Sequence, residues 1–320
     1  MSLSEFALID DYIATSDSKR PDVCLGIGDD CAVLDVPAGK SLAVSMDTLV
    51  EGRHFTEDAD PASLGYKALA VNLSDLAAMG AIPAWATLSL TLPEADTRWL
   101  EAFMQGFLQL ADRFGVQLVG GDTTRGPLSI TVQIQGFVDP GKMMRRNGAR
   151  AGDLLYVTGM LGDAGLALRL QQRGKLDPKK HRELQQRLDR PTPRVDAGLQ
   201  LAAIATAAID LSDGLIGDLG HIMQQSQVGA TIELERLPVS QAVAEAIRAD
   251  DDWSLPLSSG DDYELCFTLP EEKQRQLQQL SAKLDCQVTR IGVIEQQPGI
   301  RCITSAGKAV AVTSGYDHFA

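Results

Sequence analysis

Aspartates in apolar or glycine-rich surroundings are the residues of this sequence best placed to do chemistry. They fall in six segments: GIGDDCAV (Asp29, Asp30), SMDTLVEG (Asp47), NLSDLAAMGA (Asp75), GGDTT (Asp122), DLSDGL (Asp210, Asp213) and SGDDYEL (Asp261, Asp262). A single aspartate at a strand end is most often a turn former or a helix cap. The repeated set is explained more economically by a site for hard cations, because Mg²⁺ takes one or two carboxylates per ion together with substrate phosphates.

Asp75 is the aspartate that a turn or a cap explains least well. Its neighbours include Leu73, Leu76 and Met79, which make the surrounding helix apolar nearly all round. A carboxylate in such a helix must be paired or bound to a cation. The sequence therefore predicts a functional role for Asp75.

Other candidate residues carry weaker signals, and each has a plain structural reading. The pair Gly120-Gly121 allows close approach of the backbone to a phosphate, although a β-turn is an equal explanation. Arg146 could clamp a phosphate or solvate a linker. His54 could contact substrate or pack at the surface.

Familiar catalytic and nucleotide-binding motifs are absent. Gly39-Lys40-Ser41 lacks the first glycine of a phosphate-binding P-loop, because Leu34 stands at that position. In the run that begins at Gly26, Cys31 stands where a dinucleotide fingerprint has its last glycine. No H-E-x-x-H or G-x-S-x-G motif occurs, and the five cysteines never have C-x-x-C spacing, which argues against zinc and disulfide frameworks.

Composition limits the class of protein. The chain has 320 residues, of which 44% are hydrophobic and 22% charged, as expected for a soluble globular protein of two domains. Its 29 basic and 43 acidic residues give a net charge of −14, which disfavours nucleic acid and anionic membranes as partners. A polyphosphate substrate would need metal ions to approach. The acidic N-terminal region is unlike a signal peptide, and no apolar run reaches the roughly 18 residues of a membrane span, so a cytoplasmic protein is expected.

The elements that must position these residues alternate along the chain. In the first half, after a helical pattern at the N-terminus, the patterns predict helices over 61–80 and 94–114 and strands over 26–36, 40–50, 87–92, 116–124 and 129–138. In the second half they predict strands over 154–159, 264–269 and 287–295, helices over 162–174, 181–193 and 270–284, and a strand, turn and helix over 205–226. The fold class is therefore α/β or α+β.

Residues 139–153 form the predicted connection between two domains. This segment, DPGKMMRRNGARAGD, combines proline, glycines and basic residues without an apolar period. We place an N-terminal domain over 1–138 and a C-terminal domain over 139–320.

Taken in order, the six aspartate segments resemble the thiamine-monophosphate kinase family over nearly the whole chain. That family shares a superfamily of ATP-dependent enzymes with aminoimidazole ribonucleotide synthetase, selenophosphate synthetase and a hydrogenase maturation protein. The resemblance implies an N-terminal ATP- and Mg²⁺-binding domain whose strands pair with a second subunit in a dimeric barrel. It also implies a larger C-terminal α/β domain that completes the nucleotide and substrate site, with ATP in the cleft between the domains.

The resemblance further implies an activity and a set of site residues. The γ-phosphoryl group of ATP would pass to thiamine monophosphate, giving thiamine diphosphate, the last step of thiamine diphosphate biosynthesis. Several Mg²⁺ ions would be held by Asp30, Ser45, Met46, Asp47, Asp75, Asp122, Asp210 and Asp213, with Met46 acting through its carbonyl and Asp29 as a supporting partner. ATP would contact Gly121, Asp122, Arg146 and Ser212, and thiamine monophosphate would contact His54, Asp261 and Phe319.

Direct in-line transfer without a covalent intermediate is the mechanism expected from these residues. An acceptor phosphate is already a nucleophile at neutral pH, so no catalytic Ser, Cys or general base is required. Two alternatives remain open: a sister synthetase that acts on another acceptor, and an acidic Mg²⁺- or Ca²⁺-binding protein without turnover. Calcium loops of the EF-hand kind are absent from the sequence.

Overall fold

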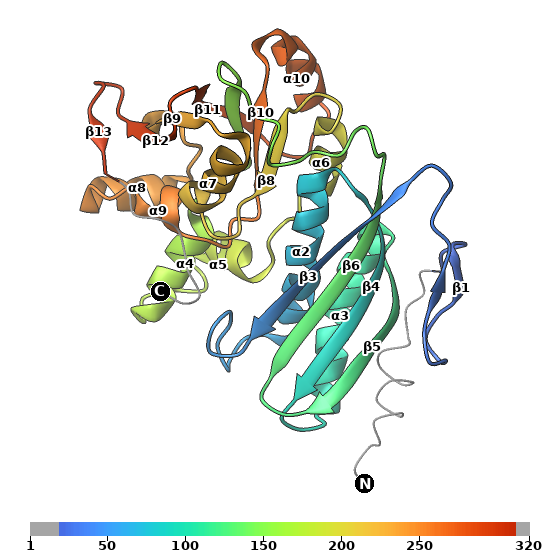
Figure 1. Cartoon of the computed structure of the whole chain (residues 1–320). Helices are drawn as coiled ribbons and strands as arrows, with labels where there is room; N and C mark the ends of the chain where they lie inside the picture. Colours follow the sequence, from blue (N-terminus) through green and yellow to red (C-terminus); the bar gives the residue numbers. More distant parts are fainter. Residues whose placement is uncertain (1–18, 312–320) are drawn as a thin grey trace. The chain divides into compact units, whose positions relative to one another are not determined.

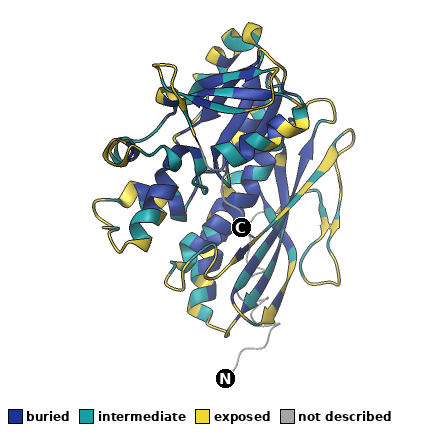
Figure 2. Ribbon diagram, turned by 60° about the vertical axis from the view of Figure 1, so that its left-hand side comes forward, coloured by how far each residue is buried: buried dark blue, intermediate teal, exposed yellow. Residues whose placement is uncertain are grey.

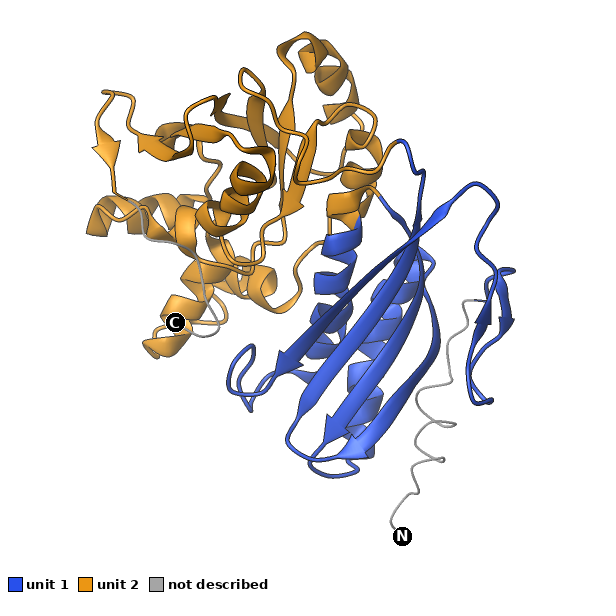
Figure 3. Cartoon of the chain, in the orientation of Figure 1, with its two compact units in different colours: residues 1–76, 81–141 blue, residues 77–80, 142–320 orange. Residues whose placement is uncertain are grey.

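In a computed structural model, which describes residues 19–311, the chain divides into two units (Figure 3). Unit 1 comprises residues 1–76 and 81–141, and unit 2 comprises residues 77–80 and 142–320. The main passage between the units thus follows Gly141. Within the described part of the chain, every helix is too short or too polar to cross a membrane.

Unit 1 is a four-stranded sheet with two long helices and a small hairpin. Its elements are β1 (Val23–Leu25), β2 (Val33–Leu34), β3 (Ser41–Val50), α2 (Pro61–Met79), β4 (Ile82–Leu92), α3 (Thr97–Phe114), β5 (Gln117–Arg125) and β6 (Ser129–Val138). The strand order is β3-β6-β4-β5, in which β4 and β5 are parallel and the other pairs antiparallel. The predicted helix over 61–80 and the predicted strands over 40–50 and 129–138 are confirmed within a residue at each end.

Helices α2 and α3 lie on the same face of this sheet (Figure 1). They touch where glycines remove the side chain: a Cβ on Gly65 would lie 1.9 Å from the carbonyl oxygen of Phe103, and one on Gly106 would lie 1.7 Å from that of Ala62. Helix α3 begins after Asp96, whose side chain caps it, and it ends at Gly115 with φ 62°. The close contact holds α2, the helix that carries Asp75, against α3.

Strand β3 is an edge strand with an exposed apolar side. Leu42, Val44 and Met46 are 44%, 55% and 60% exposed, and they alternate along the strand on the side away from the helices. At another part of the sheet, Trp85 is buried in a small cluster to which the β1–β2 hairpin contributes. The side of β3 away from the helices is therefore open in the single chain.

Unit 2 is built on a seven-stranded mixed sheet. Its elements are β7 (Leu154–Thr158), α4 (Asp163–Gln172), α5 (Arg182–Asp189), α6 (Val195–Leu201), β8 (Ala207–Asp210), α7 (Leu215–Ser226), β9 (Gly229–Glu233), η2 (Leu234–Arg236), α8 (Gln241–Asp250), α9 (Ser254–Ser258), β10 (Leu265–Leu269), η3 (Glu271–Lys273), α10 (Gln274–Ser281), β11 (Val288–Glu295), β12 (Gly299–Ile303) and β13 (Ala309–Val310). The strand order is β13-β12-β9-β11-β7-β10-β8. Strands β7, β10 and β8 are buried along their whole length (Figure 2), and the core of the unit extends from them to β9, β11 and β12.

The mixed α/β fold class is confirmed, and two local predictions are wrong. Instead of a strand over 26–36 there is only the two-residue β2, because Gly28 has φ 118° and the Asp29 side chain accepts the backbone N–H of Asp30, which turns the chain. The predicted helix over 270–284 is divided into a 3₁₀ turn and α10. The N-terminal helical pattern lies outside the described residues.

Candidate functional site

The predicted site residues fall into two groups, one in each unit. Unit 1 carries Asp30, Ser45, Met46, Asp47, His54, Asp75, Gly121 and Asp122, and unit 2 carries Arg146, Asp210, Ser212, Asp213 and Asp261. Phe319 lies outside the described residues.

Strand β3 and helix α2 bring Ser45 and Asp75 together. The Ser45 hydroxyl donates a hydrogen bond to Oδ2 of Asp75. Asp47 is two residues further along β3, so its side chain lies on the same side of the sheet, toward the helices. This part of unit 1 therefore carries three side chains, Ser45, Asp47 and Asp75, whose oxygen atoms could bind a cation.

Met46 has its side chain on the opposite face of β3. It is 60% exposed, whereas Ser45 and Asp47 on either side of it are half-buried. A thioether is also a poor ligand for a hard cation. Any contact of Met46 with Mg²⁺ must therefore use its backbone carbonyl.

His54 is fixed by the turn that follows β3. The ring Nδ1 of His54 accepts a hydrogen bond from the backbone N–H of Val50 at 3.0 Å. The backbone N–H of His54 donates to the Val50 carbonyl, also at 3.0 Å. An accepting Nδ1 places the proton of the neutral ring on Nε2. The neutral ring thus carries a donor, Nε2–H, beside the accepting Nδ1, and a donor of this kind suits an anionic substrate group.

Gly121 and Asp122 lie on β5, the edge of the sheet opposite β3. The register across the sheet aligns Asp47 with Gly121 through Val132 and Leu88. Three strand spacings separate them, which is about 14 Å. The glycine itself is required by β4, because a Cβ there would lie 1.9 Å from the carbonyl oxygen of Leu88.

A preassembled carboxylate cage is absent from residues 19–311. No three His, Cys, Asp or Glu side chains in this part of the chain are grouped closely enough to hold a metal ion. Asp30 is exposed in the turn after Gly28. Mg²⁺ is usually held by one or two carboxylates, with phosphate and water oxygens completing its shell, so the paired oxygen ligands of β3 and α2 fit that ion.

In unit 2, the segments DLSDG and SGDDYEL run side by side. The backbone N–H of Tyr263 donates to the Leu211 carbonyl at 2.8 Å, and that of Asp261 donates to the Ser212 carbonyl at 2.9 Å. Gly260 is needed at this approach, since a Cβ there would lie 2.3 Å from the Ser212 carbonyl oxygen. The predicted nucleotide segment and the predicted substrate segment are thus joined by backbone hydrogen bonds.

Asp218 shapes the turn of the DLSDG segment, and the sequence reasoning missed it. Its Oδ2 accepts the backbone N–H groups of Asp213 and Gly214, both at 3.1 Å. Burial, reinforced by the charge of Asp213, raises the pKa of Asp218 to about 7. Its position four residues after Gly214, in the first turn of α7, was the available signal, because carboxylates there cap helix N-termini.

The SGDDYEL segment has unusual backbone geometry at two of its inner residues. Asp261 and Tyr263 have φ of 67° and 49°, in the left-handed region that side chains other than glycine rarely adopt. The Tyr263 hydroxyl donates to Oδ1 of Asp261 at 3.1 Å. Between them, the Asp262 carboxylate accepts the N–H of Gly162 at 2.9 Å, and burial together with the charge of Glu264 raises the pKa of Asp262 well above its usual range.

Arg146 is exposed at the start of unit 2. Its carbonyl accepts a hydrogen bond from Ser226 at 2.7 Å, and its positive charge acts on Asp218, where it opposes the rise in pKa. The guanidinium is therefore near enough to the DLSDG turn for its charge to act on Asp218.

Two family models cover most of the chain. Residues 28–138 match the N-terminal domain of AIR synthase related protein, and residues 150–305 match the C-terminal domain of AIR synthase related protein.

Individual relatives match over the full length. Thiamine-monophosphate kinase of Escherichia coli (strain K12) is 49% identical, with 100% of this chain and 99% of the relative aligned. A crystal structure of thiamine-monophosphate kinase from Stenotrophomonas maltophilia K279a has a TM-score of 0.88 at 49% identity and covers 97% of this chain and 99% of its own. AaThiL complexed with AMPPCP and TMP has a TM-score of 0.77 at 34% identity, covering 100% of this chain and 99% of its own. The chain therefore belongs to the thiamine-monophosphate kinase family, within the AIR synthase related proteins.

Proposed function

We propose that this protein transfers the γ-phosphoryl group of ATP to the phosphate of thiamine monophosphate, giving thiamine diphosphate and ADP. The observation that carries the proposal is the full-length similarity to thiamine-monophosphate kinases, together with the TM-score of 0.77 to AaThiL complexed with AMPPCP and TMP. The described site adds oxygen ligands for cations in unit 1 and two joined acidic segments in unit 2.

Binding and alignment are the tasks of the protein's own residues in this reaction. The acceptor phosphate attacks directly, so the protein needs to hold donor and acceptor in line and to exclude water. The Nε2–H of His54 is suited to donate to the acceptor phosphate. The carboxylate of Asp261 is suited to the positively charged thiazolium ring of the substrate.

Mg²⁺ is the cation that this site fits. We assign Asp30, Ser45, Asp47, Asp75, Asp122, Asp210 and Asp213, with the Met46 carbonyl, as its ligands. Bound Mg²⁺ would neutralise the phosphate charges that otherwise keep two anions, and a protein of net charge −14, apart. Arg146 and Ser212 complete the ATP contacts, and Phe319 is assigned to thiamine monophosphate by resemblance alone.

A homodimer is part of the proposal. The exposed apolar side chains of β3, Leu42, Val44 and Met46, would be buried by a second protein surface. Asp122 lies on the opposite edge of the sheet from Asp47. Contacts of β3 with β5 of a second copy, made twice around a two-fold axis, would close the sheets into a barrel. They would also bring the edge that carries the partner's Asp122 to the edge that carries Asp47.

The two domains divide these tasks. We assign metal binding and dimerisation to residues 1–138 and completion of the nucleotide and substrate site to residues 139–320. A cytoplasmic location is proposed from the five reduced thiols, Cys24 and Cys31 among them being exposed.

The activity is tested by measuring ADP release and thiamine diphosphate by chromatography. Product is expected only when ATP, Mg²⁺ and thiamine monophosphate are all present. ATP hydrolysis that ignores thiamine monophosphate would contradict the proposal and favour a sister synthetase. A labelled protein band after incubation with radiolabelled ATP and denaturation would contradict direct transfer.

The shared site is tested by mixing two inactive variants, Asp47→Asn and Asp122→Asn. If each site takes one residue from each subunit, a randomly reassociated mixture regains about a quarter of wild-type activity, because half of the dimers are mixed and each holds one intact site. Activity that stays absent on mixing would place both residues in a site of one chain.

A further inference from the structure

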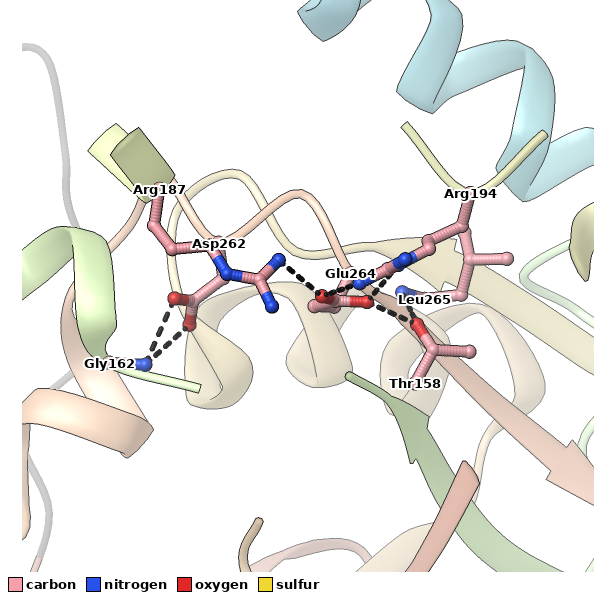
Figure 4. Close-up of polar contacts among 7 residues, drawn as sticks. All are labelled: Thr158, Gly162, Arg187, Arg194, Asp262, Glu264 and Leu265. Carbon is pink, nitrogen blue, oxygen red and sulfur yellow. Dashed lines mark hydrogen bonds and ion pairs between the residues drawn. The ribbon is translucent and has the colours of Figure 1, made fainter. Parts of the chain in front are cut away.

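Glu264, the glutamate of the SGDDYEL segment, forms a buried ion pair with Arg194 (Figure 4). The Glu264 side chain is 1% exposed and that of Arg194 is 5% exposed. Nε and Nη2 of Arg194 donate to the two carboxylate oxygens of Glu264 at 2.6 and 2.5 Å, and the Thr158 hydroxyl donates to one of them at 2.7 Å. Arg187 lies at 3.6 Å on the more exposed side. Both oxygens of Glu264 are therefore occupied by donors.

A glycine at the end of the neighbouring strand leaves space for the Glu264 carboxylate. Gly159 follows β7 with φ 58°, and a Cβ there would lie 1.9 Å from Oε1 of Glu264. Thr158 also accepts the backbone N–H of Leu265 at 2.8 Å, so the hydroxyl joins the carboxylate to the start of β10. These contacts hold the carboxylate in place.

The backbone of Glu264 transmits that position to the two acidic segments. The Glu264 carbonyl accepts the backbone N–H of Leu211 at 2.8 Å. Two further backbone hydrogen bonds run from the N–H of Tyr263 to the Leu211 carbonyl and from the N–H of Asp261 to the Ser212 carbonyl. Asp261 and Tyr263 keep left-handed backbone conformations, which persist only where the surroundings impose them. The Gly162 N–H holds Asp262 from one side, and Arg194 holds Glu264 from the other.

A buried ion pair is a poor device for stability alone. Apolar residues of similar volume often stabilise a protein as much as a buried ion pair does, because the cost of removing two charges from water cancels much of their attraction. Its bidentate geometry, in contrast, fixes direction as well as distance. Such a pair therefore suits a place where the position of a neighbouring group must be fixed.

We propose that Arg194 and Glu264 are positioning residues for the acceptor substrate: the pair sets the backbone of Asp261–Tyr263 and so the place of the Asp261 carboxylate. The inference rests on the proposed function, since it assigns Asp261 to thiamine monophosphate. Neither Arg194 nor Glu264 needs to touch the substrate.

The test compares Michaelis constants of wild type with those of Glu264→Gln and Arg194→Lys. Each variant loses part of the fork between guanidinium and carboxylate while keeping nearly the same volume. The KM for thiamine monophosphate is expected to rise about tenfold and that for ATP less than about twofold, because a small displacement of a positioned group is costly. A role in stability alone would lower the melting temperature and the fraction of active enzyme and leave both KM values unchanged.

Glu295→Gln is the matched control. Glu295 also accepts from one threonine, Thr231 at 2.5 Å, and from one arginine, Arg301, but this pair is about one-third exposed and lies on β11 and β12. Both KM values are expected to stay at the wild-type level in this variant.

The outcomes separate the inference from the proposed function. A wild-type protein that makes no thiamine diphosphate contradicts the proposed function. An active wild type with folded variants whose KM for thiamine monophosphate is unchanged overturns the inference alone. Failure of both Glu264→Gln and Arg194→Lys to fold also overturns it, because the pair would then serve the stability of unit 2.

Discussion

The hydroxyl of Ser45 on β3 donates a hydrogen bond to the carboxylate of Asp75 on α2, a contact that joins sheet and helix in unit 1. Asp75→Asn keeps an acceptor for this bond but lacks the charge that Mg²⁺ requires. We expect kcat to fall at least about 100-fold while the melting temperature changes by less than about 2 °C. Steady-state kinetics and thermal unfolding measure both. Asp58→Asn, an exposed aspartate of the same unit, should change neither, and wild-type turnover of Asp75→Asn would refute the metal assignment.

His54→Ala should selectively weaken the binding of the acceptor substrate, thiamine monophosphate. Loss of a hydrogen bond to a charged phosphate is worth about a tenfold rise in KM for thiamine monophosphate, whereas the KM for ATP should change less than about twofold. His181→Ala is a close control, because His181 Nδ1 accepts the N–H of the residue four positions earlier, Asp177, at the same 3.0 Å. The reverse pattern of KM values would assign His54 to the nucleotide.

Asp163 makes the stability of unit 2 depend on pH. Burial raises its pKa, opposed by the Ser240 hydroxyl, which donates to its Oδ1 at 2.5 Å, and by the charge of Arg187, while the charge of Glu183 adds to the rise. Because the folded protein holds this proton more tightly, its contribution to the free energy of unfolding is complete below about pH 4 and is lost as pH rises through the folded-state pKa.

Asp163→Asn removes this titration and keeps the acceptor for Ser240. In EDTA, its melting temperature should fall less than that of wild type as the pH rises from 4 to 8. Asp196→Asn, an exposed acidic residue in the first turn of α6, should follow the wild-type curve. If the melting temperatures of Asp163→Asn and wild type change equally with pH, the raised pKa of Asp163 does not affect stability.

Gly106→Ala should destabilise unit 1 by roughly 3 kcal/mol, since its Cβ would lie 1.7 Å from the Ala62 carbonyl oxygen and would force α2 and α3 apart. Gly220→Ala in α7 has no atom within 4 Å of the added carbon, so helix propensity alone should stabilise it by about 0.5–1 kcal/mol. Chemical denaturation measures both. Equal stability of Gly106→Ala and wild type would mean that the helices separate without cost.

Local patterns predicted the elements of this fold better than its connections. Helix α2 and the Asp75 within it were readable because an apolar helix makes a lone carboxylate conspicuous. The Asp29–Asp30 strand prediction failed because the positive φ of Gly28 and a side-chain hydrogen bond turn the chain. Neither leaves a signal in hydrophobic periodicity.

The partners of the site residues could not be predicted, because they depend on contacts distant in sequence. Arg194 and Glu264 are 70 positions apart, and no local pattern joins them. The placement of β3 and β5 at opposite edges likewise follows from strand order rather than from composition. The residues assigned by resemblance stay predictions until kinetics test them.

The exposed side of β3 has a consequence for the newly made single chain. An edge strand that displays Leu42, Val44 and Met46 to solvent is a template on which other strands can add, including those of incomplete chains emerging from the ribosome. Rapid overproduction should therefore drive this protein into inclusion bodies through β3, and slow synthesis at low temperature should favour soluble material.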